Sequence, residues 1–111
     1  MNDNGCVSET LGDYVLVRLS GEVDLSWSQQ VRRAILDALG TAGKVGVELS
    51  QVSYIDSSGI AALVEGFQNA RSHNRTFGLV AVSAAVMAVL QLARLDRVFP
   101  IFTDLDAARA V

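Results

Sequence analysis

Apolar residues recur with two different periods along the chain, and each period indicates a kind of secondary structure. Alternate residues from Val15 to Leu19 are apolar, which is typical of a strand with one buried face. Gly12-Asp13 lies just before this run and fits a two-residue turn from a preceding strand. The strands expected from such runs cover residues 6–11, 14–20, 44–49, 77–82 and 98–102.

A longer period predicts helices between these strands. From Val31 to Leu39, apolar residues recur at i, i+3, i+4, i+7 and i+8 with polar residues opposite, so one face is expected to pack on a sheet. This helix is expected to begin at a cap formed by Ser26 or Ser28 and to end near Gly40. The other expected helices run from the 56–59 segment to about residue 73, over 84–93 after the cap Ser83, and from about residue 104.

The order of these elements indicates an α/β fold. A strand, a helix and a strand over residues 44–82 form a βαβ unit, whose strands are expected to be parallel with a right-handed crossover. Pro100 cannot donate a backbone hydrogen bond, so it places the last strand at a sheet edge. We therefore expect a single domain over residues 1–111, with a mixed four- to five-stranded sheet and helices mainly on one side.

Composition narrows the classes of function. Half of the 111 residues are apolar, so a core can close without disulfides, and Cys6, the only cysteine, is expected to be a small apolar strand residue. The net charge is −3 and the nine basic residues are scattered, which argues against a nucleic-acid partner. The first twenty residues lack a secretory signal pattern, and the longest apolar-rich stretch, residues 79–93, is too short to span a bilayer. We expect a cytoplasmic protein without direct membrane insertion.

The segment Asp56-Ser57-Ser58-Gly59 lies where an expected strand is followed by a helix. In open α/β sheets, ligands and partners gather at the carboxyl ends of strands. A serine at this point is expected to be exposed, and a phosphate added to it would meet free N–H groups of the first helical turn. The same residues also fit an ordinary helix cap, with a glycine that eases a tight turn. Both interpretations remain open from the residues alone.

The residues around this segment do not complete an enzyme. A serine hydrolase needs a base within hydrogen-bond reach, but the only histidine, His73, lies about 22 Å from Ser58 along a helix. Receiver domains accept phosphate on an aspartate and use a lysine after a late strand, whereas Lys44, the only lysine, starts a strand. The chain lacks a phosphate-binding loop ending in lysine, and one cysteine with one histidine falls short of a zinc site. We expect no catalytic residues, no metal and no cofactor.

Three segments in a fixed order point to a known family. Gly-Glu-Val-Asp at 21–24 follows an early strand, and Val-Glu-Leu at 47–49 leads through Tyr-Ile at 54–55 to Asp-Ser-Ser-Gly at 56–59. The stretch 90–102 adds Leu92, Leu95, Asp96 and Phe99. In this order and spacing, the segments resemble the STAS domain family, and more narrowly the bacterial anti-sigma factor antagonists. The resemblance covers nearly the whole chain.

The resemblance implies a protein-binding switch. In such antagonists the first serine after the aspartate is phosphorylated by a partner that is both anti-sigma factor and serine kinase, and Ser57 holds the matching position. The unphosphorylated protein binds the anti-sigma factor and frees the sigma factor; phosphorylation releases the antagonist, and a phosphatase resets it. Asp24 matches the acidic residue of the early loop near the phosphoacceptor, Asp56 matches the one before it, and Ser58 and Gly59 complete the turn.

A docking surface is expected beside this segment. The 84–93 helix carries more apolar residues than one buried face needs, and its periodicity leaves Met87 and Gln91 facing out. Trp27, just beyond the 21–24 segment, is a second candidate contact, and burial over the first helix is the alternative for it. Exposed aromatic and methionine side chains are typical anchors of protein interfaces.

Two other functions remain as alternatives. Some stand-alone STAS proteins resemble this chain but serve as subunits of membrane ABC transporters, including lipid transporters, where the partner is a permease or an ATPase. In many of those the serine pair reads Thr-Ala, so Ser57-Ser58 favours the switch. A weak nucleotide-binding or hydrolytic domain is the third interpretation, and it lacks a lysine or base at the segment to carry out the chemistry.

Overall fold

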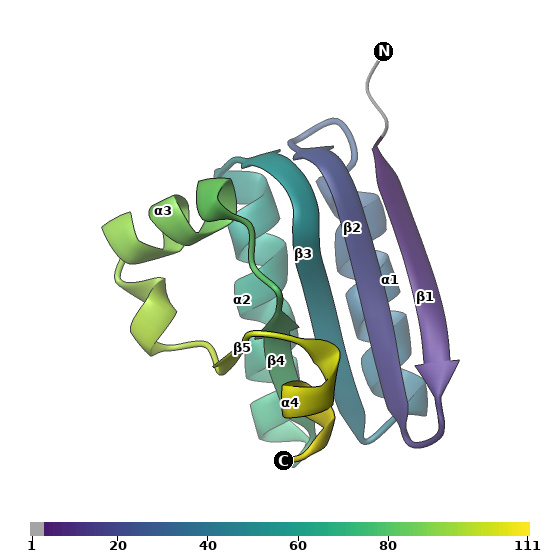
Figure 1. Ribbon diagram of the computed structural model, residues 1–111. Coiled ribbons are helices and arrows are strands. Elements are labelled where there is room, and N and C mark those ends of the chain that lie inside the picture. Colours follow the sequence, from purple (N-terminus) through teal and green to yellow (C-terminus); the bar gives the residue numbers. More distant parts are fainter. Residues whose placement is uncertain (1–3) are drawn as a thin grey trace.

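The computed structural model describes residues 4–111 as a five-stranded sheet with helices packed against it (Figure 1). The strands are β1 (Gly5–Leu11), β2 (Tyr14–Val23), β3 (Lys44–Ile55), β4 (Thr76–Val80) and β5 (Ile101–Phe102). The helices are α1 (Ser28–Thr41), α2 (Ser57–Ser72), α3 (Ala84–Leu92), the 3₁₀ turn η1 (Leu95–Arg97) and α4 (Leu105–Arg109). Among these elements no helix combines the length and apolar character needed to cross a bilayer.

The strands lie in the sheet in the order in which they occur in the chain. β1 pairs antiparallel with β2, and all later pairs are parallel. The turn between β1 and β2 is Gly12-Asp13, where Gly12 has a φ of 67° that suits the first central position of a hairpin turn. The predicted α/β class with a mixed sheet is therefore confirmed.

The helices form two unequal layers. α1 and α2 lie side by side against one face of the sheet, behind it in Figure 1, whereas α4 covers only part of the opposite face. The larger core fills the space under α1 and α2 and includes the fully buried Leu19, Ile35, Leu49, Leu63 and Leu79. The smaller core under α4 contains Tyr14, Leu16, Val80 and Ala108. Helices thus lie mainly on one side, as predicted.

Two strands run further than predicted, and this extension shapes the site. β2 continues past Ser20 through Gly21 to Val23, and β3 continues past Leu49 to Ile55. Their pairing shifts register between Arg18 and Ser20 and again between Gly21 and Glu22. Gly21 has a φ of 84°, which glycine adopts without steric cost. The 21–24 segment therefore bends a paired strand, and the prediction that it ends the strand is wrong.

The remaining differences concern the ends of elements. β4 ends at Val80 because Ala81 turns into the left-handed region at a φ of 51°. β5 is shorter than the predicted 98–102, since η1 occupies the chain before Pro100. Neither Ser26 nor Ser28 caps α1; the cap residue is Trp27, whose side chain makes no capping bond. The predicted cap of α3 is confirmed, because Ser83 accepts a hydrogen bond from the Val86 N–H.

Candidate functional site

The junction between β3 and α2 lies at one end of the sheet. Because β2, β3 and β4 are parallel, their carboxyl ends lie at the same end, near the top of Figure 1. The β2–α1 loop, the β3–α2 junction and the start of α3 gather there. The junction residues predicted to act, 56–59, therefore share a surface with the loop that holds Asp24.

Asp56 caps α2 through its carboxylate. Its Oδ1 accepts hydrogen bonds from the Ser58 N–H at 2.9 Å and from the Gly59 N–H at 3.1 Å. The expectation that a phosphate would meet free first-turn N–H groups is therefore wrong for these two groups, since the Asp56 carboxylate already occupies them. The capping interpretation of the segment is confirmed, and it applies to Asp56 rather than to the serines.

The hydrogen bonds to Asp56 also set its charge. They lower the pKa of its carboxyl from the usual 3.8, and the largest cause is the Ser58 hydroxyl, which donates to Oδ1 at 2.6 Å. The Ser58, Gly59 and Leu25 backbone N–H groups act in the same direction, while partial desolvation opposes them. Asp56 is therefore a fixed negative charge at neutral pH.

The two serines of the junction differ in what their hydroxyls do. Ser58 is half-buried and its hydroxyl is held by Asp56. Ser57 is exposed, and its hydroxyl forms no hydrogen bond with any residue from 4 to 111. The hydroxyl that is accessible to a modifying enzyme is thus the one at position 57, in the first turn of α2.

Gly59 lets the first turn of α2 pack directly on the strand ends. A Cβ at this position would lie 2.6 Å from Ile55 Cγ1 and 2.7 Å from Val23 Cγ1. Both atoms belong to buried side chains at the ends of β3 and β2, where packing leaves little room to move. Glycine is therefore required at position 59 by the close approach of the helix.

The β2–α1 loop is bound to the junction by two hydrogen bonds. The Leu25 N–H donates to Asp56 Oδ2 at 3.2 Å, and the Asp56 N–H donates to the Val23 carbonyl at 3.1 Å. Asp24, between Val23 and Leu25, accepts from both the N–H and the hydroxyl of Ser26 through its Oδ1. The residue that follows Asp24 therefore binds the Asp56 carboxylate directly, so Asp24 belongs to the loop that contacts the junction.

Trp27 is buried. The residue is 8% exposed, and its indole N–H donates to the Glu22 carbonyl. Of the two alternatives for this residue, the structure shows burial, because the ring packs into the main core and its polar atom is satisfied within the bent end of β2. Trp27 supports the β2–α1 loop from inside.

Apolar side chains nevertheless lie exposed at this end of the molecule. Leu25, whose backbone N–H binds Asp56, is 75% exposed. Tyr54, two residues before Asp56, is 50% exposed. On α3, Met87, predicted to face out, is only half-buried, and Leu92, at the end of the helix far from the junction, is 89% exposed. Leu25 was not among the predicted contact residues, although an apolar residue between Asp24 and Ser26 in a polar loop is a signal that could have identified it.

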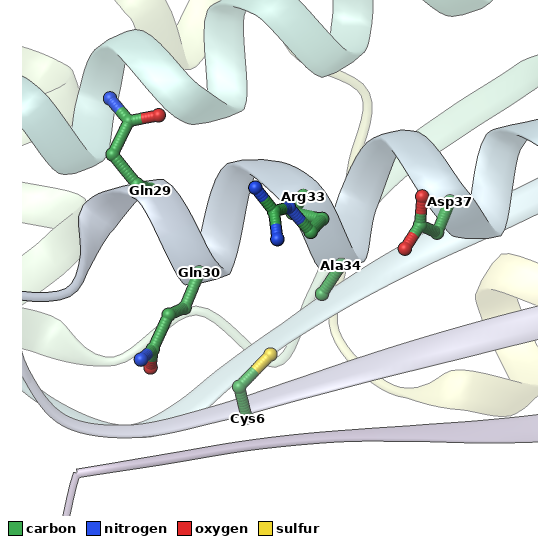
Figure 2. Close-up of a pocket in the computed structure, with 6 residues that line it drawn as sticks. All are labelled: Cys6, Gln29, Gln30, Arg33, Ala34 and Asp37. Carbon is green, nitrogen blue, oxygen red and sulfur yellow. The ribbon is translucent and has the colours of Figure 1, made fainter.

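A groove in the surface lies away from this junction. It has a volume of about 400 Å³ and runs between β1 and α1, with Cys6, Gln30 and Arg33 among its lining residues (Figure 2). Burial raises the pKa of the Cys6 thiol. Across residues 4–111, no three His, Cys, Asp or Glu side chains gather in a way that could hold a metal ion.

Comparison with known proteins identifies the family. The model of the STAS domain matches residues 6–108. An anti-sigma factor antagonist from Mycobacterium paratuberculosis has a similar structure, with a TM-score of 0.86 at 25% identity over 97% of this chain and 92% of that one. The antagonist SpoIIAA is similar in its unphosphorylated form (TM-score 0.81, 21% identity, 96% and 98% covered) and, from Bacillus, in its phosphorylated form (0.76, 21%, 96% and 97%). The chain belongs to the STAS domain family.

Proposed function

We propose that this STAS domain is an anti-sigma factor antagonist whose binding is switched by phosphorylation of Ser57. The observation that carries the proposal is the difference between the two serines: the Ser57 hydroxyl is exposed and unbonded within the described chain, while Asp56 holds that of Ser58. The similarity to solved anti-sigma factor antagonists supports the partner class. The domain then acts by binding in the cytoplasm, and it needs no catalytic group, metal or cofactor of its own.

The charge distribution explains how one phosphate can end the interaction. A phosphate adds about −1.5 to −2 charge and would arrive beside the Asp56 carboxylate, on the surface that also holds Asp24. Two first-turn N–H groups that could have neutralised it are already bonded to Asp56. A partner carboxylate about 5 Å away would be repelled by about 3 kcal/mol per unit charge at an effective dielectric near 20. Since about 1.4 kcal/mol changes affinity tenfold, this repulsion is enough to release a partner of moderate affinity.

The binding surface consists of the junction and the exposed apolar residues around it. Asp24, Asp56, Ser58 and Gly59 shape the junction, and Leu25 lies beside it with its side chain in solvent. Met87 in the first half of α3 is a further candidate contact, because Ser83 ties the start of α3 to β3 by donating to the Val52 carbonyl at 2.7 Å. Apolar side chains next to a charge switch give a partner both affinity and control.

The partners follow from this assignment. The unphosphorylated domain binds an anti-sigma factor that is also a serine kinase, and so releases the sigma factor. That kinase phosphorylates Ser57 and thereby releases the antagonist, and a serine phosphatase restores the binding form.

The proposal is tested by phosphorylation in vitro. Incubation with a cognate anti-sigma factor kinase and ATP is expected to add one phosphate at Ser57, located by mass spectrometry. Ser57→Ala should abolish the modification, whereas the matched variant Ser58→Ala should retain it. Ser57→Asp should weaken binding to the anti-sigma factor at least tenfold in calorimetry. Phosphate found on Ser58 or Ser83, no modification at all, or purification of the native protein with a transporter permease or ATPase would contradict the proposal.

A further inference from the structure

The strand β1 leaves one edge of the sheet open. It pairs only with β2, and no described strand lies on its outer side. Leu11 and Tyr14 flank the two-residue turn and form a hydrogen-bonded pair. In an antiparallel ladder such pairs alternate, so every second residue of β1 counted back from Leu11 directs its N–H and C=O groups toward β2. The backbone N–H and C=O groups of the intervening residues, Cys6, Ser8 and Thr10, therefore point outward from the edge.

The two edges of the sheet are protected very differently. β5 has two residues and directly follows Pro100, so it offers almost nothing for pairing. β1 has seven residues with an uninterrupted register and contains neither proline nor lysine. Natural sheets usually protect long edge strands with such residues, with bulges or with a covering segment. Within the described residues, β1 has no bulge and no covering strand, and its one charged side chain, Glu9, is paired with Arg18, so this edge suits pairing with another strand.

The side chains of β1 divide between two faces. Cys6 points toward α1 (Figure 2), so Val7 and Glu9 point to the opposite face of the sheet. Val7 is 62% exposed, and Glu9 is paired with Arg18 at 3.1 Å. The outer face of the edge thus carries one exposed apolar side chain and one charge that is already compensated.

We propose that β1 pairs antiparallel with β1 of a second copy of the chain, about a two-fold axis at Val7. In this register the two Val7 side chains bury each other, Cys6 lies opposite Ser8 of the other copy, and Glu9 lies opposite Gly5, which has no side chain. An axis at Glu9 would place two carboxylates face to face, and an axis at Ser8 would place each Val7 beside a carboxylate. Apolar burial and charge therefore select the same register.

The dimer joins two five-stranded sheets into one continuous sheet. β3 is the third strand from this edge, so the two Ser57 hydroxyls at the start of α2 remain exposed in the dimer. The inference therefore does not depend on the proposed switch, and it gives the domain two binding sites per assembly.

Sedimentation velocity over a wide concentration range tests the pairing. The mass is expected to rise from 11.8 kDa to twice that value with concentration. Ser8→Pro removes an outward N–H without touching the β1–β2 hydrogen bonds, and because the lost bond occurs twice per dimer, dimerisation should weaken about thirtyfold. Ser57→Ala, far from the edge, is the matched control and should dimerise normally. A monomer at every concentration, or a Ser8→Pro dimer as tight as wild type, overturns the proposal.

Disulfide crosslinking tests the register independently. In a Cys6→Ser background, Val7→Cys is expected to form a covalent dimer on oxidation, because a pair of this kind brings the Cα atoms to about 4.5 Å. Ser8→Cys in the same background is the control. With the axis at Val7, position 8 lies opposite position 6 of the other copy, so the Cα atoms of the two Cys residues would be about 8 Å apart, too far for a disulfide. Crosslinking through position 8 and not 7, or through neither, excludes the axis at Val7.

Discussion

Two of the junctions that connect a parallel strand to a helix, β3–α2 and β4–α3, use serine in opposite ways. At the start of α3, Ser83 is itself the cap: its hydroxyl donates to the Val52 carbonyl at 2.7 Å and accepts from the Val86 N–H at 3.3 Å. At the start of α2, Asp56 is the cap, and the next residue, Ser57, keeps an exposed hydroxyl. A carboxylate that caps a helix therefore leaves the neighbouring serine available for chemistry, whereas a capping serine is committed to structure.

The third residue of each helix continues this comparison. In α3 it is Val86, which is fully buried and anchors the helix on the core. In α2 it is Gly59, which leaves no room for a side chain between the helix and the strand ends. The α2 junction is held by backbone proximity and hydrogen bonds to one carboxylate, so its surface is free to carry polar groups.

The largest effect is expected from filling the space at Gly59. Gly59→Ala should lower the free energy of unfolding by about 1–3 kcal/mol, because its Cβ would overlap Ile55 and Val23. Gly40→Ala is the matched control, since nothing lies within 4 Å of a Cβ there, and it should be neutral or slightly stabilising. Urea denaturation measures both, and equal stability of the two variants would show that the close approach at Gly59 is unimportant.

Removing the cap of α3 should have the next largest effect. Ser83→Ala is expected to lower the free energy of unfolding by about 1–2 kcal/mol, because the variant loses the bond to the Val86 N–H and leaves the Val52 carbonyl without its donor. Thermal and urea unfolding provide the measurement. If the free energy of unfolding of Ser83→Ala equals that of wild type within experimental error, the capping bond of Ser83 does not stabilise the fold.

The charge of Asp56 should appear as a pH dependence of stability. The folded state lowers the pKa of this carboxyl, so its stabilisation is complete above about pH 4 to 5 and is lost as the pH falls through the folded-state pKa. Asp56→Asn keeps a capping side chain but loses the charge, and it should cost about 0.3–1 kcal/mol of charge–dipole stabilisation at pH 7. The gap to wild type should narrow on acidification, and a gap of constant size from pH 7 to pH 3 would contradict this assignment.

The smallest effect is expected at Ser57. Ser57→Ala should change the free energy of unfolding by less than about 0.5 kcal/mol, because the hydroxyl is exposed and makes no bond within the described chain. Together with the result for Ser83→Ala, this separates a structural serine from one available for modification. A clearly destabilised Ser57→Ala protein would show that this hydroxyl also has a structural role.

The sequence predicted the elements better than their limits. Periodicity located α1 and α2, because each buries a regular apolar stripe on the sheet. It did not predict that β2 continues through Gly21 and Glu22, since a register shift between two strands depends on tertiary pairing and leaves no local period. Propensity alone cannot tell a strand break from a bend that stays paired.

Within the candidate site, local signals were again more informative than distant ones. The Asp56 cap follows from residue type and position, and so does the exposure of Ser57 at the start of a helix. The exposure of Leu25 and the burial of Trp27 depend on how the β2–α1 loop binds Asp56, thirty-one residues from Leu25 along the chain. No pattern within the loop contains that contact.

The sequential order of the strands has a consequence for how the chain assembles. Each strand after the first joins an edge formed by the strand before it, so none must insert between two neighbours already in place. Loop-closure costs stay low when consecutive segments pair. Asp56 and the loop it binds lie within the first sixty residues, so the bond between the Leu25 N–H and Asp56 joins segments that are synthesised before β4 and α3.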